Sequence, residues 1–299
     1  MRRRDFLKTA GTAAVMPILG NTITPSEKVS STSARLFVGC CAYSYSKHLN
    51  AGAMKMEDFF RKAVELGVHG IDVTTYWLKS TDPEDLTALR HLAFKNGLPF
   101  SGAAIRTEMC QPDSGKRVEE VRKIQQWVDA TELLGASHLR VFGGEIPAGG
   151  TEQQQQAMGW VVETMKPACD YAAKRGITLG IEDHGGITAH ASTILEILRR
   201  VDSPYAGVNL DISNFEAQSD EGQYFDIEAC VPFATHAHIR DLFTETGRPI
   251  DLDRVWKLFA KGGYKGYMSA EYEGKEDPMT GVPKLIEKIK TLCSKYSSA

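Results

Sequence analysis

Residues 178–212 read TLGIEDHGGITAHASTILEILRRVDSPYAGVNLDI and contain one complete unit of a pattern that recurs along the chain. The short apolar runs at 178–183 and 206–212 have the length and the β-branched content of buried strands. Residues 191–201 between them carry apolar side chains at helical spacing. A strand, a helix and a second strand joined in this way predict two parallel strands with a helix crossing between them.

The same alternation runs from residue 36 to the end of the chain. Eight strands are predicted, at 36–43, 70–77, 100–107, 137–144, 178–183, 206–212, 235–240 and 266–272. They recur at about the length of one βαβ unit, roughly 30 residues. The chain has 299 residues, and one (β/α)8 barrel needs about 250. We therefore expect an α/β fold with a single (β/α)8 TIM barrel. A doubly wound sheet would carry a glycine-rich dinucleotide turn after its first strand, and GCCAYSYS at 39–46 has none.

Amphipathic stretches between these runs predict the helices. They lie at 56–67, 82–97, 116–135, 154–176, 191–201, 251–263 and 281–295, with a weaker pattern at 221–231. Gly67 is suited to a C-cap, and Asp82 followed by Pro83 to a helix start. Pro167 falls inside the fourth helix, where we expect a kink.

The composition is ordinary for a soluble globular protein and gives no sign of nucleic-acid binding. Apolar residues make up 42% of the chain, charged residues 24%, and the net charge is -3. The charges are spread without long runs, so they give no electrostatic reason to expect binding to nucleic acid or to an anionic membrane surface. The six cysteines fit neither a zinc finger nor a disulfide framework, and we interpret them as small buried residues.

The first 34 residues differ from the rest. MRRRDFLKTAGTAAVMPILG at 1–20 has consecutive arginines followed by a small apolar segment, which resembles a twin-arginine export signal. Its apolar part is shorter than the roughly 20 residues of a stable membrane span. Residues 21–34 are polar and rich in Ser and Thr, as in a linker. We expect residues 1–34 to be signal and linker and 35–299 to be the barrel. The predicted location is periplasmic or otherwise exported, with the twin-arginine export machinery as a partner.

Four polar residues each stand at the carboxyl end of a predicted apolar strand, so they should lie at the same level of the barrel. They are Glu182, Asp211, His238 and Glu271, each one β/α unit after the last. Barrel enzymes carry their sites at these carboxyl ends of the strands. Three buried carboxylates would be costly without compensation, and one imidazole beside them completes a ligand set for a divalent cation. Mn²⁺ is the first expectation, with Mg²⁺, Co²⁺ or Zn²⁺ as alternatives. Arg106 and Arg240 are the basic residues best placed in the sequence to pair with the carboxylates instead.

The blocks around these residues carry a family resemblance. GIEDHGG, GVNLDISN, HAHIRD and MSAEYEG resemble, in order and spacing, the xylose isomerase-like TIM-barrel superfamily, and within it the sugar phosphate isomerase/epimerase family. The resemblance runs over about 36–296. It implies that Glu182, Asp211, His238 and Glu271 bind one divalent metal. It further implies that Glu182 and Glu271 move a proton at a carbon next to a carbonyl, through a metal-stabilised enediolate.

The resemblance predicts a keto sugar or cyclitol as substrate and an isomerase or epimerase as the enzyme class. We expect substrate contacts from five residues near strand ends: His184, Arg240, Arg106, Trp77 and Tyr43. His236 is read either as a core histidine or as a substrate contact, and Asp72 as structural. Two positions depart from the related ketose 3-epimerases, which carry His where Asn214 stands and Glu where Thr188 stands.

Three alternatives remain open at this point. The same first step followed by elimination would give a lyase or dehydratase acting on a 3-keto-glycoside or inosose. A nuclease of the same superfamily would need more histidine ligands than the strand ends provide. A sugar-binding barrel without catalysis would not need all four ligands. The predicted partner is a small carbohydrate, with no nucleic acid and no stable membrane span, and an oligomer remains open.

Overall fold

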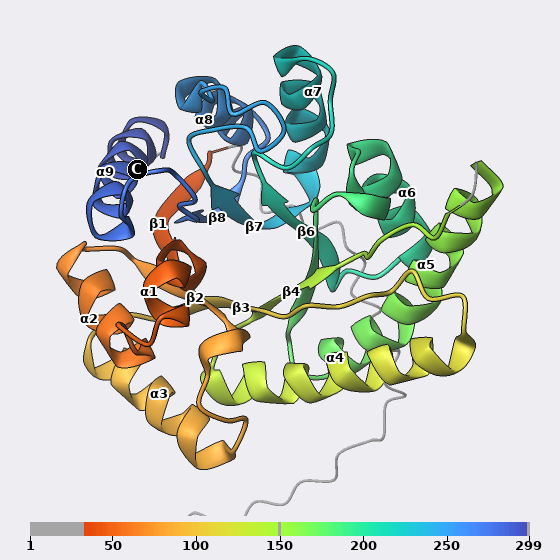
Figure 1. The fold of residues 1–299 in the computed structure, drawn as a ribbon, viewed down its shortest axis with the longest axis horizontal. Coiled ribbons are helices and arrows are strands. Elements are labelled where there is room, and N and C mark those ends of the chain that lie inside the picture. Colours follow the sequence, from red (N-terminus) through yellow and green to blue (C-terminus); the bar gives the residue numbers. More distant parts are fainter. Residues whose placement is uncertain (1–32, 149–150, 298–299) are drawn as a thin grey trace, which may run out of the picture. The chain divides into compact units, whose positions relative to one another are not determined.

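A computed structural model describes residues 33–148 and 151–297, and within them eight parallel strands close into a barrel in sequence order. Figure 1 shows the strands at the centre and the helices around them. The strands are β1 (Arg35–Cys41), β2 (Gly70–Thr74), β3 (Phe100–Ala104), β4 (His138–Phe142), β5 (Thr178–Glu182), β6 (Ala206–Asp211), β7 (Ala234–Ile239) and β8 (Lys265–Ala270). The predicted (β/α)8 barrel is confirmed, and each strand overlaps the run that predicted it.

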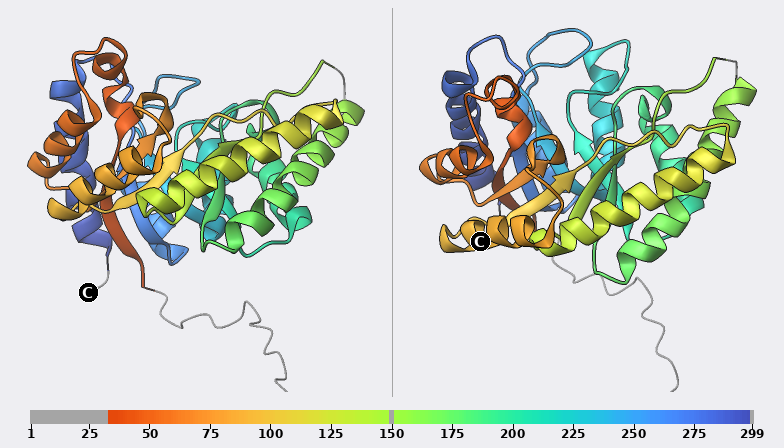
Figure 2. Two further views of the ribbon diagram at one scale, coloured as in Figure 1. Left: turned by 90° about the horizontal axis from the view of Figure 1, so that it is seen from below. Right: turned by 60° about the horizontal axis from the view of Figure 1, so that its bottom comes forward.

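The outer helices follow the predicted order. They are α2 (Met56–Glu65), α3 (Pro83–Lys95), α4 (Ser114–Leu134), α5 (Thr151–Ala173), α6 (Ala191–Val201), α7 (Asp220–Cys230), α8 (Leu252–Lys261) and α9 (Pro278–Tyr296). Figure 2 shows the long helices α4 and α5 lying side by side along one flank of the barrel. The weak pattern at 221–231 forms the helix α7, and α5 continues through Pro167 as one helix.

Short elements after the first two strands were not predicted. The run predicted as a strand over 36–43 stops at Cys41, and η1 (Ala42–Tyr45) and α1 (Ser46–Asn50) follow it. After β2 the chain turns into η2 (Thr75–Trp77). These turns place aromatic side chains at the upper rim of the barrel, so they shape the entrance to the site.

Side-chain alternation explains the two sides of the barrel wall. Apolar residues of the strands pack outward against the helices, as Ile181 and Val208 do, and both are fully buried. Polar side chains fill much of the interior instead. His236 is buried there, stacks on His138 and contacts Ser101 Oγ through Nε2 at 3.2 Å. Burial lowers the pKa of His236 to about 4. It is therefore a histidine of the barrel core and does not line the cavity described below.

The six cysteines are all free and buried, as interpreted from the sequence. Within the part of the chain that the structure describes, no helix is long and apolar enough to cross a membrane. The predicted twin-arginine signal lies outside the described residues.

The register of neighbouring strands brings the predicted ligands to one level. Asp211 on β6 pairs with His238 on β7, and His238 pairs in turn with Ser269 on β8. Glu182 is the last residue of β5, and Glu271 directly follows β8. All four side chains thus belong to the carboxyl-terminal end of the barrel, where the loops of barrel enzymes carry their chemistry.

Candidate metal centre and cavity

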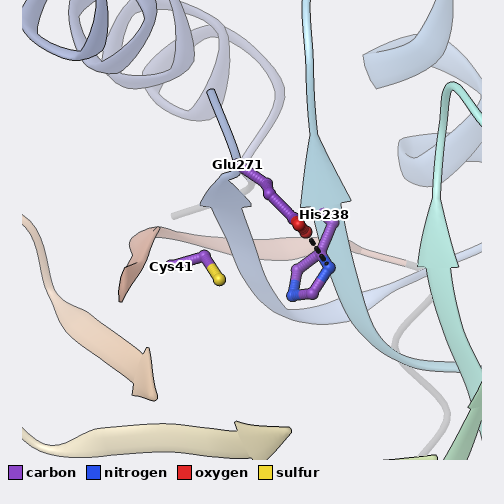
Figure 3. A group of neighbouring side chains, drawn as sticks. All are labelled: Cys41, His238 and Glu271. Atoms are coloured by element: carbon purple, nitrogen blue, oxygen red, sulfur yellow. Dashed lines mark ion pairs between the residues drawn. The ribbon is translucent and has the colours of Figure 1, made fainter. Parts of the chain in front are cut away.

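The four predicted ligands converge. One donor atom from each of Glu182, Asp211, His238 and Glu271 lies within 4.8 Å of the others, and all four residues are buried. His238 Nδ1 is 2.5 Å from Glu271 Oε2 and 3.5 Å from Glu182 Oε1. Figure 3 shows Glu271 and His238 pointing toward each other from neighbouring strands. The arrangement offers three carboxylate oxygens and one imidazole nitrogen to a single point.

Two arginines balance the carboxylates. Arg140 Nε lies 2.8 Å from Glu182 Oε2, and Arg240 Nε lies 3.0 Å from Asp211 Oδ2. Arg240 also reaches Glu271 Oε1 with Nη2 at 3.5 Å and pairs through Nη1 with Glu273. Both guanidinium groups are buried in the barrel mouth. Two basic residues were expected from the sequence to pair with the carboxylates, and Arg240 does so. Arg106 is instead exposed on the cavity rim. Its expected place beside a ligand carboxylate is taken by Arg140, which pairs with Glu182.

These charges decide which carboxylates are ionised. Burial opposes the ionisation of Glu182, yet Arg140 and His238 lower the pKa of its carboxyl group below the ordinary value. Burial also opposes the ionisation of Glu271, yet His238 and Arg240 lower its pKa. For Asp211, burial outweighs the pairing with Arg240 and raises the pKa. Glu182 and Glu271 are consequently held as carboxylates, the form that accepts a proton or binds a cation.

The backbone and side chains around Asp211 fix its position. Ser213 donates to Asp211 Oδ1 from its amide at 2.9 Å and from its hydroxyl at 2.7 Å. The Asp211 amide donates to Asp183 Oδ1 at 2.8 Å. Burial, with Asp211 and Glu182 nearby, raises the pKa of the Asp183 carboxyl group well above its ordinary value. Asp183 therefore supports the ligand strand through the Asp211 amide.

The donor set fits a divalent cation. The buried oxygens Glu182 Oε2, Asp211 Oδ2 and Glu271 Oε2 have ion-pair neighbours but no hydrogen-bond partner. Buried carboxylate oxygens are nearly always hydrogen-bonded or bound to a metal. Three such oxygens with one imidazole suit Mn²⁺, Mg²⁺, Co²⁺ or Zn²⁺.

A cavity of about 310 Å³ opens above the ligands. Its wall is mostly charged or hydroxyl-bearing, which suits a polyhydroxylated molecule. The lining residues are Tyr43, Tyr76, Arg106, Thr107, Glu108, Arg140, Phe142, Gly144, Glu145, Glu182, His184, Asn214, Arg240, Thr244, Glu271 and Glu273.

The cavity brings together most of the residues predicted to contact substrate. Tyr43, Arg106, His184 and Arg240 line it. His184 stacks on Phe142 with ring centroids 4.2 Å apart, which fixes its ring at the wall. Trp77 instead lines a separate cavity beside α2 and α3, packs near Tyr43 and donates from Nε1 to Asn50 Oδ1 at 2.9 Å.

Tyr76 shows why the aromatic side chain at this rim could not be chosen from the sequence. Its exposed ring lines the cavity above the ligands, whereas the neighbouring Trp77 turns away from it. The choice between adjacent aromatic residues depends on η2, a tight turn that replaces the strand alternation expected over 70–77.

A glycine makes room for one cavity carboxylate. Gly144 has φ 103°, and a side chain there would collide with Glu108. Because that space is free, both Glu108 carboxylate oxygens accept the Glu145 amide, at 3.1 and 3.2 Å. Burial raises the pKa of the Glu108 carboxyl group.

Asn214 lines the cavity and has an amide donor without a partner. Its Oδ1 accepts from the Thr244 hydroxyl at 2.8 Å, whereas its Nδ2 is buried without a hydrogen-bond partner. The Ser213 hydroxyl, which contacts Thr244 Oγ1 at 3.2 Å, ties this pair to Asp211.

Sequence reasoning did not single out Arg140, Glu273, Tyr76 or the amide of Asn214 as parts of the site. One signal was available for Arg140, an arginine inside the apolar strand run 137–144. A charged residue there has to find a buried partner.

Comparisons with known proteins agree with the barrel fold. The family described as "Xylose isomerase-like TIM barrel" matches residues 60–292. No curated protein matches the chain. Among solved structures, a D-tagatose 3-epimerase-like protein has a TM-score of 0.70 and 17% identity, over 87% of this chain and 99% of that one. D-allulose 3-epimerase from Methylomonas sp. has a TM-score of 0.68 and 18% identity, over 88% and 98%. The 3-keto-D-glucoside 4-epimerase of E. coli has a TM-score of 0.67 and 14% identity, over 86% and 99%. At these identities the likenesses show the shared fold.

Proposed function

The chain belongs to the xylose isomerase-like TIM barrel family, and on that premise we propose that it is a divalent-metal-dependent isomerase or epimerase. Its substrate is a hydroxy-carbonyl compound, a keto sugar or a cyclitol. The observation that carries the proposal is the convergence of Glu182, Asp211, His238 and Glu271 on one point beneath a polar cavity. The epimerases among the similar structures support the same class of reaction.

A divalent cation held by these four residues would supply Lewis-acid stabilisation for negative charge developing on substrate oxygens. Mn²⁺ is our first choice of ion, because three carboxylates and one imidazole form a mostly oxygen donor set.

Glu182 and Glu271 are the proposed proton carriers. Both border the cavity, and their lowered pKa values keep them ionised at neutral pH. A carboxylate oxygen of one takes the proton from the carbon beside the carbonyl group. Return of a proton to the neighbouring carbon gives isomerisation, and delivery to the opposite face of the same carbon gives epimerisation. Asp211 has its Oδ1 occupied by Ser213, so we assign it to metal binding with His238.

The remaining cavity residues orient the substrate. Arg240, Asn214 and His184 present donors at the wall, and Tyr43 offers an aromatic surface. Such groups recognise sugar hydroxyls by hydrogen bonding and apolar ring faces by stacking.

Proton exchange tests the proposal directly. The protein would be incubated with Mn²⁺ in D₂O, with a panel of ketoses, inososes and 3-keto-glycosides, and followed by NMR. We expect exchange of one C–H next to the carbonyl, its loss after metal removal by a chelator, and its loss in Glu182→Gln. An isomeric product identifies an isomerase or epimerase, whereas an unsaturated product would replace this proposal with the lyase. Absence of metal-dependent exchange across the panel would contradict both.

We also propose export through the twin-arginine route, from the arginines and apolar segment of residues 1–20. Because this route carries folded proteins, the metal would be inserted before export. A fluorescent reporter fused to residues 1–34 should reach the periplasm, and Arg3→Lys with Arg4→Lys should retain it in the cytoplasm. Export of the doubly substituted fusion would refute the proposal.

A further inference from the structure

Asp72 is a buried carboxylate on β2 whose neighbours are unusual. It is 3% exposed, and both carboxylate oxygens are buried without a hydrogen-bond partner. Among the described residues, its ion-pair contacts are two imidazoles: His238 Nε2 at 3.4 Å and His236 Nε2 at 3.8 Å. No arginine or lysine in that part of the chain compensates it, unlike Glu182 and Asp211. A carboxylate kept in such a place needs a role that an apolar residue could not fill.

The two ring nitrogens of His238 face different groups. Nδ1 lies among the ligand oxygens of Glu271 and Glu182, and Nε2 lies on the side of Asp72. A neutral imidazole carries one hydrogen, so whichever nitrogen holds it leaves the other as a lone-pair donor. Only the form with hydrogen on Nε2 can offer Nδ1 to a cation.

We propose that Asp72 is a positioning residue for the metal centre. Nε2 of His238 is 3.4 Å from Asp72 Oδ1, so a small rotation of the ring lets the carboxylate accept a hydrogen bond from it. That bond selects the tautomer with a lone pair on Nδ1 and fixes the orientation of the ring. Carboxylate–histidine–metal arrangements orient ligands in this way and raise their basicity. The inference rests on the metal site of the proposed function, but not on the reaction.

The neighbours on the Nε2 side favour Asp72 as the acceptor. Figure 3 shows the Cys41 side chain near the ring nitrogen of His238 that does not pair with Glu271. Cys41 Sγ, a ring nitrogen of His238 and a carboxylate oxygen of Glu271 lie within 4.8 Å of one another, and all three residues are buried. Burial raises the pKa of the Cys41 thiol well above its ordinary value, so the sulfur remains a thiol and a weak acceptor. His236 Nε2 contacts Ser101 Oγ at 3.2 Å and is the farther of the two imidazoles from Asp72.

Metal affinity provides the first test. Mn²⁺ would be titrated calorimetrically into the metal-free full-length protein and into Asp72→Asn and Asp72→Ala. We expect the dissociation constant to rise about 10- to 100-fold in Asp72→Ala. The rise should be smaller in Asp72→Asn, because the amide oxygen still accepts a hydrogen bond. Ser101→Ala is the matched control: it removes a polar contact of His236 in the same interior without touching His238, and should leave the affinity unchanged.

The tautomer of His238 provides a readout that packing alone would not change. In ¹⁵N-histidine-labelled, Mg²⁺-loaded protein, NMR should show hydrogen on Nε2 of His238 and none on Nδ1. Thermal unfolding of the metal-free variants shows whether Asp72→Asn retains the fold, and the affinity of that variant is compared only at temperatures where it is folded. Unchanged affinity in both Asp72 variants, or hydrogen on Nδ1 in the loaded protein, would overturn the inference.

These measurements need no sugar, so they separate the inference from the proposed reaction. A weakened metal site in the Asp72 variants supports the positioning role even if no panel substrate exchanges its proton. Conversely, exchange by the wild-type protein together with unaltered affinity in the Asp72 variants would leave the proposed function standing and remove the role of Asp72.

Discussion

Arg140 Nε on β4 lies 2.8 Å from Glu182 Oε2 at the end of β5, and both side chains are buried. The Arg140 guanidinium on β4 therefore stabilises the Glu182 carboxylate, which the neighbouring strand β5 places at the cavity. Arg140 also stacks over Phe142, whose ring in turn packs against His184. The proposed base, its counter-charge and one wall of the cavity thus form a single packed unit.

Replacing Arg140 should destabilise the metal-free protein. Arg140→Met leaves Glu182 buried without its arginine, and removal of one partner of a buried pair costs about 3–5 kcal/mol of unfolding free energy. Denaturant unfolding of the metal-free protein measures this loss. Arg106→Met is the matched control, because Arg106 is an exposed arginine of the same cavity and should change stability by less than about 0.5 kcal/mol. Equal losses in both variants would contradict the role given to Arg140.

Glu271→Gln should lower turnover by orders of magnitude while leaving metal bound. The amide oxygen can still face the cation but cannot take up a proton, and loss of a general base typically lowers the rate by about 10²–10⁴-fold. Initial rates with whichever panel substrate reacts, together with metal content by elemental analysis, check both parts. Glu273→Gln alters a carboxylate that shares Arg240 and the cavity wall but lies outside the ligand group, so its loss should be much smaller. Near-normal rates in Glu271→Gln would refute the assignment.

Asn214→Ala should weaken substrate use without affecting the metal. The change removes the amide of a cavity-lining residue, whose buried Nδ2 has no partner within the protein. One neutral hydrogen bond contributes about 0.5–1.5 kcal/mol, or roughly a 2- to 10-fold fall in kcat/KM. Thr244→Val should cause part of this loss, because it frees the amide oxygen that Thr244 holds at 2.8 Å. Steady-state kinetics measure the loss of substrate use, and Mn²⁺ titration checks that metal affinity is unchanged. Unchanged kcat/KM in Asn214→Ala would show that the amide does not meet the substrate.

The contacts of Asp253 should contribute to stability at neutral pH and lose that contribution in acid. Lys257, Lys295 and Tyr296 hydrogen-bond its carboxylate and lower its pKa. Two of these contacts tie α8 to α9, from Lys295 Nζ at 2.6 Å and Tyr296 Oη at 2.8 Å. A lowered folded-state pKa stabilises the protein above the unfolded value of about 3.9, and this contribution disappears as the pH falls through the folded-state pKa.

Asp253→Asn should therefore lower the thermal unfolding midpoint at pH 7, and the difference from wild type should shrink as the solution is acidified below pH 4. Calorimetric scans across that range measure it. Glu245 is exposed and makes no ion pair among the described residues, so Glu245→Gln should follow wild type throughout. A difference for Asp253→Asn that stays constant with pH would contradict the electrostatic explanation.

Local patterns in the sequence were enough to predict the barrel and its ligand level. Alternating apolar runs and amphipathic stretches predicted eight strands and their helices, because burial of one face sets a period of two in strands and 3.6 in helices. Glu182, Asp211, His238 and Glu271 were found because each ends such a run and parallel strands carry their carboxyl ends on the same side. Strand ends were less accurate: the runs 36–43 and 70–77 end in 3₁₀ turns that periodicity does not reveal.

The sequence by itself determined the strand order, the level of the four ligands and the family. Only the tertiary structure decided that Arg140 rather than Arg106 neutralises Glu182, that Tyr76 rather than Trp77 faces the cavity, and that Asp72 lies against His238. The reason is geometric. Periodicity along one strand shows which side of the barrel wall a residue faces, but barrel closure alone determines which side chains from distant strands meet inside it.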